Sequence, residues 1–324
     1  MMQAGEAERG AGLAAGAGGL LDEVLRGLSA PRKALSPKWL YDARGSALYE
    51  LICEQPEYYP ARTERAILEA HVQEIAAAVG PRVEVFEFGA GSARKTARLL
   101  AALEAPAAYL PVDISPEAVL AAAEALRARF PRLPVRPVVG DFTNGVELPA
   151  TPGDPSRRLA FFPGSTIGNF DPPEAVALLR KMAVEAGPDG GLLIGVDHPK
   201  DRVTLEAAYD DARGVTAAFD LNLLARLNRE LGADFRLSGF RHRSLWNERC
   251  GRVEMHLESL EPQAVTVGGL RFAFRQGETL HTESAYKWEP RAFDALAAIG
   301  GWRPERSWSD ARAWFSLRLY RRAG

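Results

Sequence analysis

Five short strand-like runs alternate with helical segments through the middle of the chain, and this alternation constrains the fold more than any other feature. The runs are rich in β-branched and aromatic residues and occupy 83–88, 109–114, 135–142, 158–170 and 191–198. Helix-start signals stand between them, such as the N-cap serine, proline and acid of Ser115-Pro116-Glu117. Strands joined by helices form parallel βαβ units with right-handed crossovers. The pattern therefore predicts an α/β fold, a doubly wound sheet between helices.

The alternation stops near residue 200. A helical pattern follows at 203–231, and strand-like segments come at 252–260 and at 263–275, where Gly268-Gly269 marks a turn. A helix at 291–299 and a strand at 314–320 are expected to return to the first sheet. We therefore predict a tail and two domains: a flexible tail at 1–18, a sheet domain at 63–199 and 286–324, and a smaller α+β domain built from two segments, 19–62 and 200–285.

Charge and composition exclude two classes of partner. The 324 residues carry a formal net charge of −2, and the basic residues are scattered among acids. A nucleic-acid-binding protein needs a basic face, and no apolar run approaches the roughly 18 residues that span a bilayer. The N-terminus is rich in Ala and Gly and has acids where a signal peptide carries basic residues. We expect a cytoplasmic monomer that binds neither nucleic acid nor membranes.

A glycine loop joins the first strand to the helix that follows it. Gly89 and Gly91 leave the backbone bare, so that a ligand can approach the amides at a helix N-terminus. A dinucleotide-binding loop reads GxGxxG, but Arg94 stands where the third glycine belongs. The loop therefore predicts a nucleotide-type cofactor and leaves open which one.

Side chains near the strand ends favour S-adenosylmethionine over NAD. Asp113 ends the next strand, about 20 residues on, where it can accept hydrogen bonds from ribose hydroxyls. Asp141 can accept from an adenine amino group, with Phe142 against the ring. Lys95 can pair with a carboxylate, which S-adenosylmethionine has and a nicotinamide dinucleotide lacks. Because parallel strands end at one edge, these side chains are expected to lie together.

These residues lie in segments that closely resemble the ergothioneine-pathway L-histidine Nα-methyltransferases. The segments follow one another from about residue 36: WLYDARGSALYELICEQPEYYPARTE, FEFGAGSARKT, PVDIS, GDF, FFPGSTIGNF, AYDDARGVTAAFDLNLLARLNRELGADF and LHTES…KW. The resemblance implies three methyl transfers from S-adenosylmethionine to the α-amino group of L-histidine, which gives the betaine hercynine in ergothioneine biosynthesis. It also implies a class I, Rossmann-like methyltransferase core and a substrate-binding domain made of two chain segments.

The resemblance also assigns roles to residues. The expected cofactor-binding residues are Gly89, Gly91, Lys95, Asp113, Asp141 and Phe142. The expected substrate-binding residues are Tyr41, Tyr58, Gly164, Asn169, Tyr209, Met255 and Glu283. Among these, Tyr58 and Asn169 are expected to orient the reacting amine, Tyr209 to bind the carboxylate, and Met255 and Glu283 to face the imidazole.

One position departs from the family pattern. Family members usually carry serine two residues after the glutamate, as a partner for the imidazole ring, whereas Glu283 is followed there by Ala285. A lost partner for a buried polar group typically costs about 1–3 kcal/mol. Histidine as substrate and another aromatic amino acid or small amine both remain open at this point.

The five histidines show no HxH or HxxxH spacing, so solvated or structural roles are expected and no metal site is predicted. Two other classes of protein compete with the methyltransferase. A non-catalytic S-adenosylmethionine-binding module is disfavoured, because it needs no amino-acid pocket. A nicotinamide oxidoreductase is disfavoured by Arg94 in the glycine loop.

Overall fold

The computed structural model describes residues 19–91, 93–150, 155 and 157–323, and the tail predicted at 1–18 lies outside this range. The chain divides into two compact units, which we call unit 1 and unit 2. Unit 1 comprises Met1–Glu57, Val203–Asn247 and Val253–Ser284; unit 2 comprises Tyr58–Arg202, Glu248–Arg252 and Ala285–Gly324.

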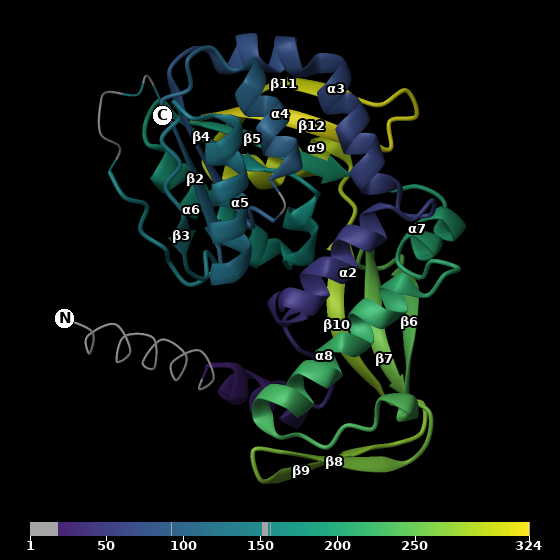
Figure 1. Ribbon diagram of the computed structural model, residues 1–324. Coiled ribbons are helices and arrows are strands. Elements are labelled where there is room, and N and C mark those ends of the chain that lie inside the picture. Colours follow the sequence, from purple (N-terminus) through teal and green to yellow (C-terminus); the bar gives the residue numbers. More distant parts are fainter. Residues whose placement is uncertain (1–18, 92, 151–154, 156, 324) are drawn as a thin grey trace, which may run out of the picture. The chain divides into compact units, whose positions relative to one another are not determined.

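Unit 2 is built on a seven-stranded sheet with the order β11-β12-β5-β4-β1-β2-β3 (Figure 1). Its strands are β1 (Val83–Phe88), β2 (Ala108–Asp113), β3 (Val138–Val139), β4 (Arg157–Phe162), β5 (Gly191–Asp197), β11 (Trp302–Ser309) and β12 (Phe315–Arg322). The first five strands pair in parallel, and β12 returns antiparallel to β5. This order confirms the predicted doubly wound sheet and the predicted return of the last strand. The run at 135–142 forms only the short β3, since Pro134 and Pro137 have no N–H to give a ladder.

Helices cover both faces of this sheet. The helices on one face are α3 (Tyr59–Val79), α4 (Arg94–Ala102) and α5 (Pro116–Arg129); those on the other are α6 (Pro172–Ala186) and α9 (Pro290–Ile299). Successive residues of β1 face opposite sides, so Val85 packs under α3 to α5 and Phe86 packs under α6 and α9. The predicted cap is present, because the Ser115 side chain accepts the N–H of Ala118 at 3.3 Å.

Unit 1 is an α+β assembly. Residues 19–29 are helical. The other elements are η1 (Pro37–Leu40), α2 (Ala43–Cys53), α7 (Arg202–Ala208), α8 (Val215–Leu231), η3 (Leu237–Gly239), β6 (Phe240–Asn247), β7 (Arg252–Ser259), β8 (Gln263–Val267), β9 (Leu270–Phe274) and β10 (Thr279–Tyr286). The sheet order is β10-β7-β6, α8 packs on β6 and α2, and β8 and β9 form a hairpin through Gly268-Gly269, as predicted.

The single helix predicted at 203–231 is wrong. The structure has two helices, α7 and α8, separated by the turn 209–214. Asp211 ends the turn by accepting the N–H groups of Val215 at 2.9 Å and Thr216 at 2.7 Å, and Gly214 adopts φ +71°. Gly214 is the N-cap residue of α8, and the Asp211 carboxylate satisfies the first N–H groups of that helix, so a second helix begins here although the apolar periodicity continues from α7.

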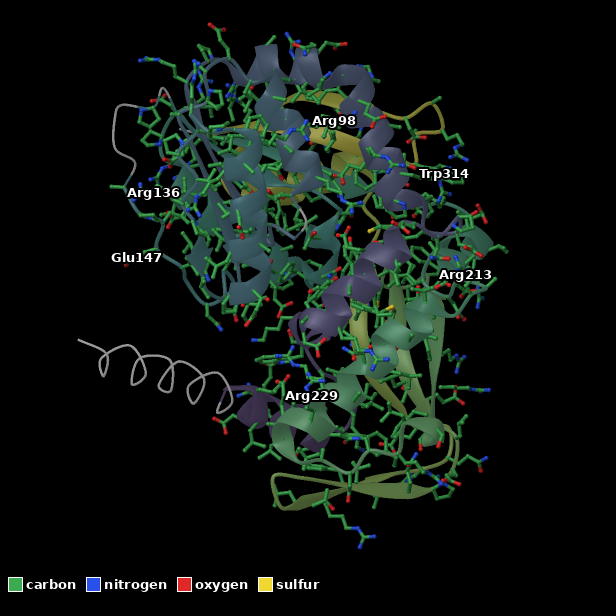
Figure 2. All side chains as sticks on the ribbon, in the orientation of Figure 1. Arg98, Arg136, Glu147, Arg213, Arg229 and Trp314 are labelled. Atoms are coloured by element: carbon green, nitrogen blue, oxygen red, sulfur yellow. The ribbon has the colours of Figure 1, made fainter. Side chains whose placement is uncertain are left out.

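Basic and acidic side chains are mixed on the surface of each unit (Figure 2). In unit 2, Arg98 of α4 pairs with Glu69 at 2.7 Å, and both are about half exposed. In unit 1, Arg229 of α8 pairs with Asp42 at 2.6 Å. Of the helices in the described residues, none is both long and apolar enough to cross a membrane.

Candidate active site

The sheet of unit 2 changes direction between β1 and β4. From β1 the chain builds outward through β2 to β3, and from β4 it builds the other way to β5. In doubly wound sheets, ligands bind outside the carboxyl ends of the strands at such a switch point. Two loops of unit 2 begin there: the glycine loop after β1 and the loop 163–170 after β4.

The glycine loop has the backbone expected of a ligand cradle. Gly89 and Gly91 adopt φ values of +75° and +47°, which a residue without Cβ tolerates. The N–H of Gly89 donates to the carbonyl of Val112 at 2.8 Å, so the loop is tied to the end of β2. A Cβ on Gly89 would lie 3.9 Å from the ring of Phe142. Bare backbone on one side and Phe142 on the other therefore shape this part of the site.

Asp113 lies beside this loop at the end of β2. Its carboxylate accepts the N–H of Ser115 at 2.9 Å, and the backbone of Gly91 also donates to it. Burial raises the pKa of Asp113, although these donors oppose the shift. The acid therefore stands where doubly wound sheets bind the ribose hydroxyls of a nucleotide.

Asp141 and Phe142 follow β3. The Asp141 carboxylate accepts the N–H of Thr143 at 2.9 Å and the side-chain amide of Asn144 at 2.9 Å, so it caps its own turn. The Phe142 ring stacks on Phe88, with centroids 5.2 Å apart and planes at 5°. The structure thus brings Phe142 to the glycine loop, while the Asp141 carboxylate is engaged within 141–144.

A buried acid of α3 connects the first turn of α4 with the loop after β4. The Lys95 ammonium donates to Glu64 Oε2 at 2.5 Å, and the N–H of Gly164 donates to Glu64 Oε1 at 2.8 Å. Gly195 of β5 makes room for this carboxylate, because a Cβ there would lie 2.2 Å from Oε1. The Lys95 side chain stays 28% exposed, which is compatible with an anionic ligand as a further partner.

A second buried acid, on β1, connects the elements that surround the glycine loop. Glu87 of β1 accepts the hydroxyls of Thr96 at 2.5 Å and Tyr109 at 2.6 Å. Burial raises the pKa of Glu87 to about 7, although both donors oppose the shift. This acid joins β1, β2 and α4, which are the three elements around the loop.

The loop 163–170 is held in one conformation by its surroundings. Ser165 adopts φ +57°, and its hydroxyl accepts the N–H of Asp197 at 3.0 Å. Gly168 has no room for a side chain, because a Cβ would lie 2.8 Å from the backbone oxygen of Tyr286. Asn169 ends the 3-10 helix η2 (Thr166–Asn169) with a partly exposed side chain. The contacts of Ser165 and Gly168 therefore fix the backbone position from which the Asn169 side chain extends.

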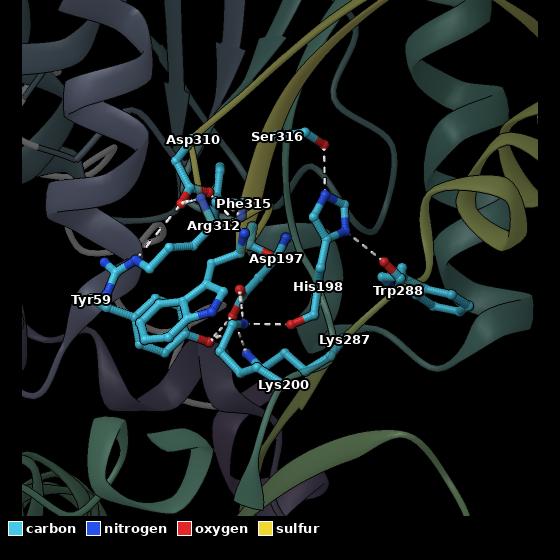
Figure 3. A network of polar contacts seen from close by, with 12 residues as sticks. Tyr59, Asp197, His198, Lys200, Lys287, Trp288, Asp310, Arg312, Phe315 and Ser316 are labelled. Atoms are coloured by element: carbon cyan, nitrogen blue, oxygen red, sulfur yellow. Dashed lines mark hydrogen bonds and ion pairs between the residues drawn. The ribbon is translucent and has the colours of Figure 1, made fainter. Parts of the chain in front are cut away.

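Asp197 is the centre of a buried charged network at the end of β5 (Figure 3). The carboxylate accepts the hydroxyl of Tyr59 at 2.6 Å, the ammonium of Lys200 at 2.7 Å and that of Lys287 at 2.9 Å. Burial raises the pKa of Asp197, but the two lysines outweigh burial and the pKa lies below its usual value. Burial and the Lys287 charge lower the pKa of Lys200 to about 8, against the attraction of Asp197.

This network fixes the start of α3, which carries the predicted catalytic tyrosine. Tyr58 is the buried N-cap residue of α3, and its neighbour Tyr59 is the one that donates to Asp197. The Lys200 ammonium also donates to the Tyr59 hydroxyl at 2.7 Å. The backbone at Tyr58 is therefore anchored one residue away.

In unit 1, the structure places Met255 and Glu283 on neighbouring strands. Met255 lies on β7 and Glu283 on β10, and the hydroxyl of Thr282 donates to the Met255 backbone oxygen at 3.1 Å. Both predicted side chains are buried. Ser284 is engaged with His281, at 3.1 Å between Oγ and Nε2.

The two other predicted residues of unit 1 are tyrosines. Tyr41 lies in an aromatic group, edge-on to Phe219 with centroids 5.4 Å apart and to Tyr49 at 5.6 Å. Tyr209 is buried at the start of the turn after α7, and its backbone oxygen contacts His242.

Sequence reasoning missed the buried acids Glu64, Glu87 and Asp197. The first lies 31 residues from Lys95 and 100 residues from Gly164, so no local spacing connects them. Asp197 had the same signal as Asp113, an acid at a strand end. Next to it, His198 is buried between the backbone oxygen of Trp288 at 2.7 Å and the Ser316 hydroxyl at 2.9 Å.

No group of three or more His, Cys, Asp or Glu side chains among the described residues is arranged to hold a metal ion. The site is instead a bare-backbone loop with acids and one lysine at the switch point of a doubly wound sheet. Together with the antiparallel β12 beside β5, these features define a class I S-adenosylmethionine-dependent methyltransferase.

The chain belongs to the histidine-specific, S-adenosylmethionine-dependent methyltransferase family, whose model matches residues 20–322. The histidine N-alpha-methyltransferases of Mycolicibacterium smegmatis and Mycobacterium tuberculosis are 41% and 39% identical over 303 residues, 92% of this chain and 93% of each relative. A more distant relative, the L-tryptophan methyltransferase of Psilocybe serbica, is 28% identical over 332 residues, 91% of this chain and 90% of its own. The resemblance seen in the sequence is thus confirmed.

Proposed function

We propose that the enzyme methylates the α-amino group of L-histidine three times and releases hercynine. The observation that carries this proposal is the Glu64 bridge in unit 2, which joins Lys95 at the cofactor loop to Gly164 in the loop of Asn169. A methyl donor and an amine must meet within reacting distance, and this bridge fixes the two loops that would hold them. The two mycobacterial histidine N-alpha-methyltransferases support histidine as the amine.

The residues of the cofactor side fit S-adenosylmethionine. Gly89 and Gly91 leave space for the nucleoside part, Asp113 would accept from the ribose hydroxyls, and Phe142 would lie along the base. Lys95 would pair with the carboxylate of the methionine part. When bound, the cofactor supplies an electrophilic methyl group on a sulfonium.

The α-amino group of the substrate must be neutral when it reacts. The amine nitrogen attacks the methyl carbon as the carbon–sulfur bond breaks, so a proton must leave the ammonium for solvent before each of the three transfers. Tyr58 and Asn169 would orient the lone pair by hydrogen bonds, and neither adds a negative charge that would keep the amine protonated. Aromatic rings also tolerate the positive charge that becomes permanent in the product.

Mass spectrometry of L-histidine incubated with the protein and S-adenosylmethionine tests the proposal. Mono-, di- and trimethylated histidine should appear in turn, with all methyl groups on the α-nitrogen by fragmentation. Methylation on the imidazole ring, or no methylated histidine, would contradict the proposal.

Ala285 favours a second candidate, an N-methyltransferase for another aromatic amino acid. The alanine offers no hydroxyl to an imidazole, and Ser284 is engaged with His281. Glu283 keeps its motif position and would pair with an imidazole N–H, which argues for histidine. A competition assay with histidine, tryptophan, tyrosine and phenylalanine separates the two. If tryptophan, tyrosine or phenylalanine is methylated faster than histidine at equal concentration, histidine is not the preferred substrate and the second candidate holds.

A further inference from the structure

One buried histidine in unit 1 connects strand β6, helix α8 and the turn after α7. His242 of β6 directs Nδ1 at Oδ2 of Asp220 on α8, 2.7 Å away. It directs Nε2 at the backbone oxygen of Tyr209, 2.8 Å away. The side chains of His242 and Asp220 are almost completely buried. A buried charged pair therefore contacts the backbone of a predicted substrate residue.

The partners of the ring determine its protonation. A backbone oxygen can only accept a hydrogen bond, and an ionised carboxylate can only accept as well. Nε2 of His242 must therefore carry hydrogen, and the contact of Nδ1 with Asp220, together with the raised pKa of His242, favours a second hydrogen there, so we treat the side chain as an imidazolium. A neutral imidazole has one N–H and would leave a nitrogen lone pair facing an oxygen.

The contact controls the first residue of the turn 209–214. The far end of this turn is fixed by Asp211, which accepts the N–H groups of Val215 and Thr216. At the near end, the backbone oxygen of Tyr209 accepts from His242. The His242 N–H, together with the bond from the Tyr209 N–H to the Glu206 backbone oxygen at 3.1 Å, holds the backbone from which the Tyr209 ring extends.

We infer that His242 and Asp220 are a positioning pair, which holds Tyr209 in place for the carboxylate of the amino-acid substrate. The inference rests on the proposed function, because that function makes Tyr209 a substrate residue. If the imidazolium loses a proton, the remaining hydrogen stays on Nδ1, because the hydrogen bond to the Asp220 carboxylate stabilises it there. The Nε2 lone pair then repels the Tyr209 oxygen, Tyr209 shifts, and amino-acid binding weakens.

The surrounding charges give the pH range. Burial lowers the pKa of His242, but the hydrogen bond and charge of Asp220, the Tyr209 oxygen and the charge of Asp210 outweigh burial, and the pKa lies above its ordinary value. A raised folded-state pKa means that the contact is fully present below the ordinary value of 6.5 and is lost as pH rises through the folded pKa.

The other histidine near the pair, His256, titrates in a different range. Burial lowers the pKa of His256 on β7, and the hydrogen bond and charge of Glu254 and the charge of Asp220 raise it by less. Arg243, on β6 itself, lowers it further. An alkaline change in amino-acid affinity therefore does not come from His256, and the part of it that His242→Gln abolishes belongs to His242 and not to Lys200, whose pKa is about 8.

The test compares the wild-type enzyme with His242→Gln across the pH range. Near neutral pH the variant should raise the KM for L-histidine about tenfold or more, with the KM for S-adenosylmethionine and kcat within about twofold. The wild-type KM for L-histidine should rise on the alkaline side, and His242→Gln should lack this rise. His71→Gln in unit 2, which removes a histidine that is about one-third exposed and paired with Glu74, is the control and should leave every constant unchanged.

Nitrogen-15 spectra of the wild-type histidine rings are a second readout, which does not require the variant to fold. One ring should show N–H on both nitrogens near neutral pH, and Asp220→Asn should convert it to a neutral ring. A neutral His242 in the wild-type protein overturns the inference, as does an unchanged KM for L-histidine in His242→Gln. If the wild-type protein does not methylate histidine at all, the proposed function fails first and this inference fails with it.

Discussion

Replacing Asp197 by asparagine should strongly destabilise unit 2. The substitution keeps the size of the side chain but removes the negative charge that pairs with the buried ammonium groups of Lys200 and Lys287 (Figure 3). It also weakens the charge-assisted hydrogen bond from the Tyr59 hydroxyl. Breaking a buried ion pair by removing one partner costs about 3–5 kcal/mol, since an uncompensated charge remains.

The two lysines do not contribute equally to this loss. The pKa of Lys200 is already lowered to about 8, so releasing its proton at about pH 7 costs only about 1.4 kcal/mol. The part of the loss that comes from Lys200 cannot exceed about 1.4 kcal/mol, because Lys200 would release its proton if the penalty on the charged form were larger. The remaining loss, about 2–4 kcal/mol, comes from Lys287 and Tyr59.

Urea denaturation followed by tryptophan fluorescence measures this loss. Four of the six tryptophans lie in unit 2, at 288, 302, 308 and 314, so the signal reports mainly on that unit. The control is Glu69→Gln, whose partner Arg98 is half exposed, and it should change the free energy of unfolding by less than about 0.5 kcal/mol.

A triple variant shows whether the loss of stability comes from the uncompensated charge or from altered packing. Asp197→Leu combined with Lys200→Met and Lys287→Met removes all three charges and should recover most of the stability that Asp197→Asn loses. A loss below about 1 kcal/mol in Asp197→Asn, or a triple variant less stable than Asp197→Asn, would refute the reasoning that an uncompensated buried charge causes the effect.

Three further predictions follow from the site. The pKa of Lys200 is lowered from 10.5 to about 8, so between about pH 8 and 10.5 the folded state binds fewer protons than the unfolded state. The contribution of Lys200 to the free energy of unfolding should therefore rise by up to about 3 kcal/mol as the pH increases through this range. Urea denaturation of Lys200→Met should lack this rise. Asp113→Ala should weaken S-adenosylmethionine binding at least about tenfold by calorimetry, and an unchanged affinity would remove Asp113 from the cofactor site. Asn169→Ala should raise the KM for histidine far more than the KM for S-adenosylmethionine in steady-state assays; equal effects would place Asn169 outside the amino-acid site.

The sheet of unit 2 was predictable from sequence, because buried parallel strands are continuous apolar runs. Strand β11 was missed for the opposite reason. Only Trp302 and Trp308 of that edge strand are buried, and Pro304 stands beside a bulge in its pairing with β12. Edge strands carry few core residues and often contain proline or a bulge, so periodicity does not reveal them.

Strands β6 and β10 of unit 1 were missed because their composition is polar. Strand β10 buries Thr282, Glu283 and Ser284 in succession, which breaks the alternation that marks a strand. Local rules tend to fail at functional sites, where polar groups are buried for a purpose. The failure at β10 coincides with the residues that we propose for side-chain selection.

The candidate site was predictable only where one segment carries its residues. The glycine loop, Asp113 and Lys95 follow from spacing, because a single βαβ unit supplies them. The partners that hold them could not be found this way. Glu64 reaches Gly164 across 100 residues, and only the packing of α3 against the sheet brings the two together.

These partners share a physical logic. Three of the segments proposed to touch the amino acid are held by a buried acid that does not itself need to touch it: Glu64 holds the backbone of Gly164, Asp197 holds Tyr59 beside Tyr58, and Asp220 acts through His242 on Tyr209. Burying a carboxylate is costly unless strong donors compensate. The chain bears this cost three times at the predicted substrate residues, where an error of about 1 Å in position can slow methyl transfer by about a hundredfold. We therefore interpret these buried acids as the means by which the tyrosine and asparagine side chains proposed to orient the amine stay aligned with it through three successive transfers.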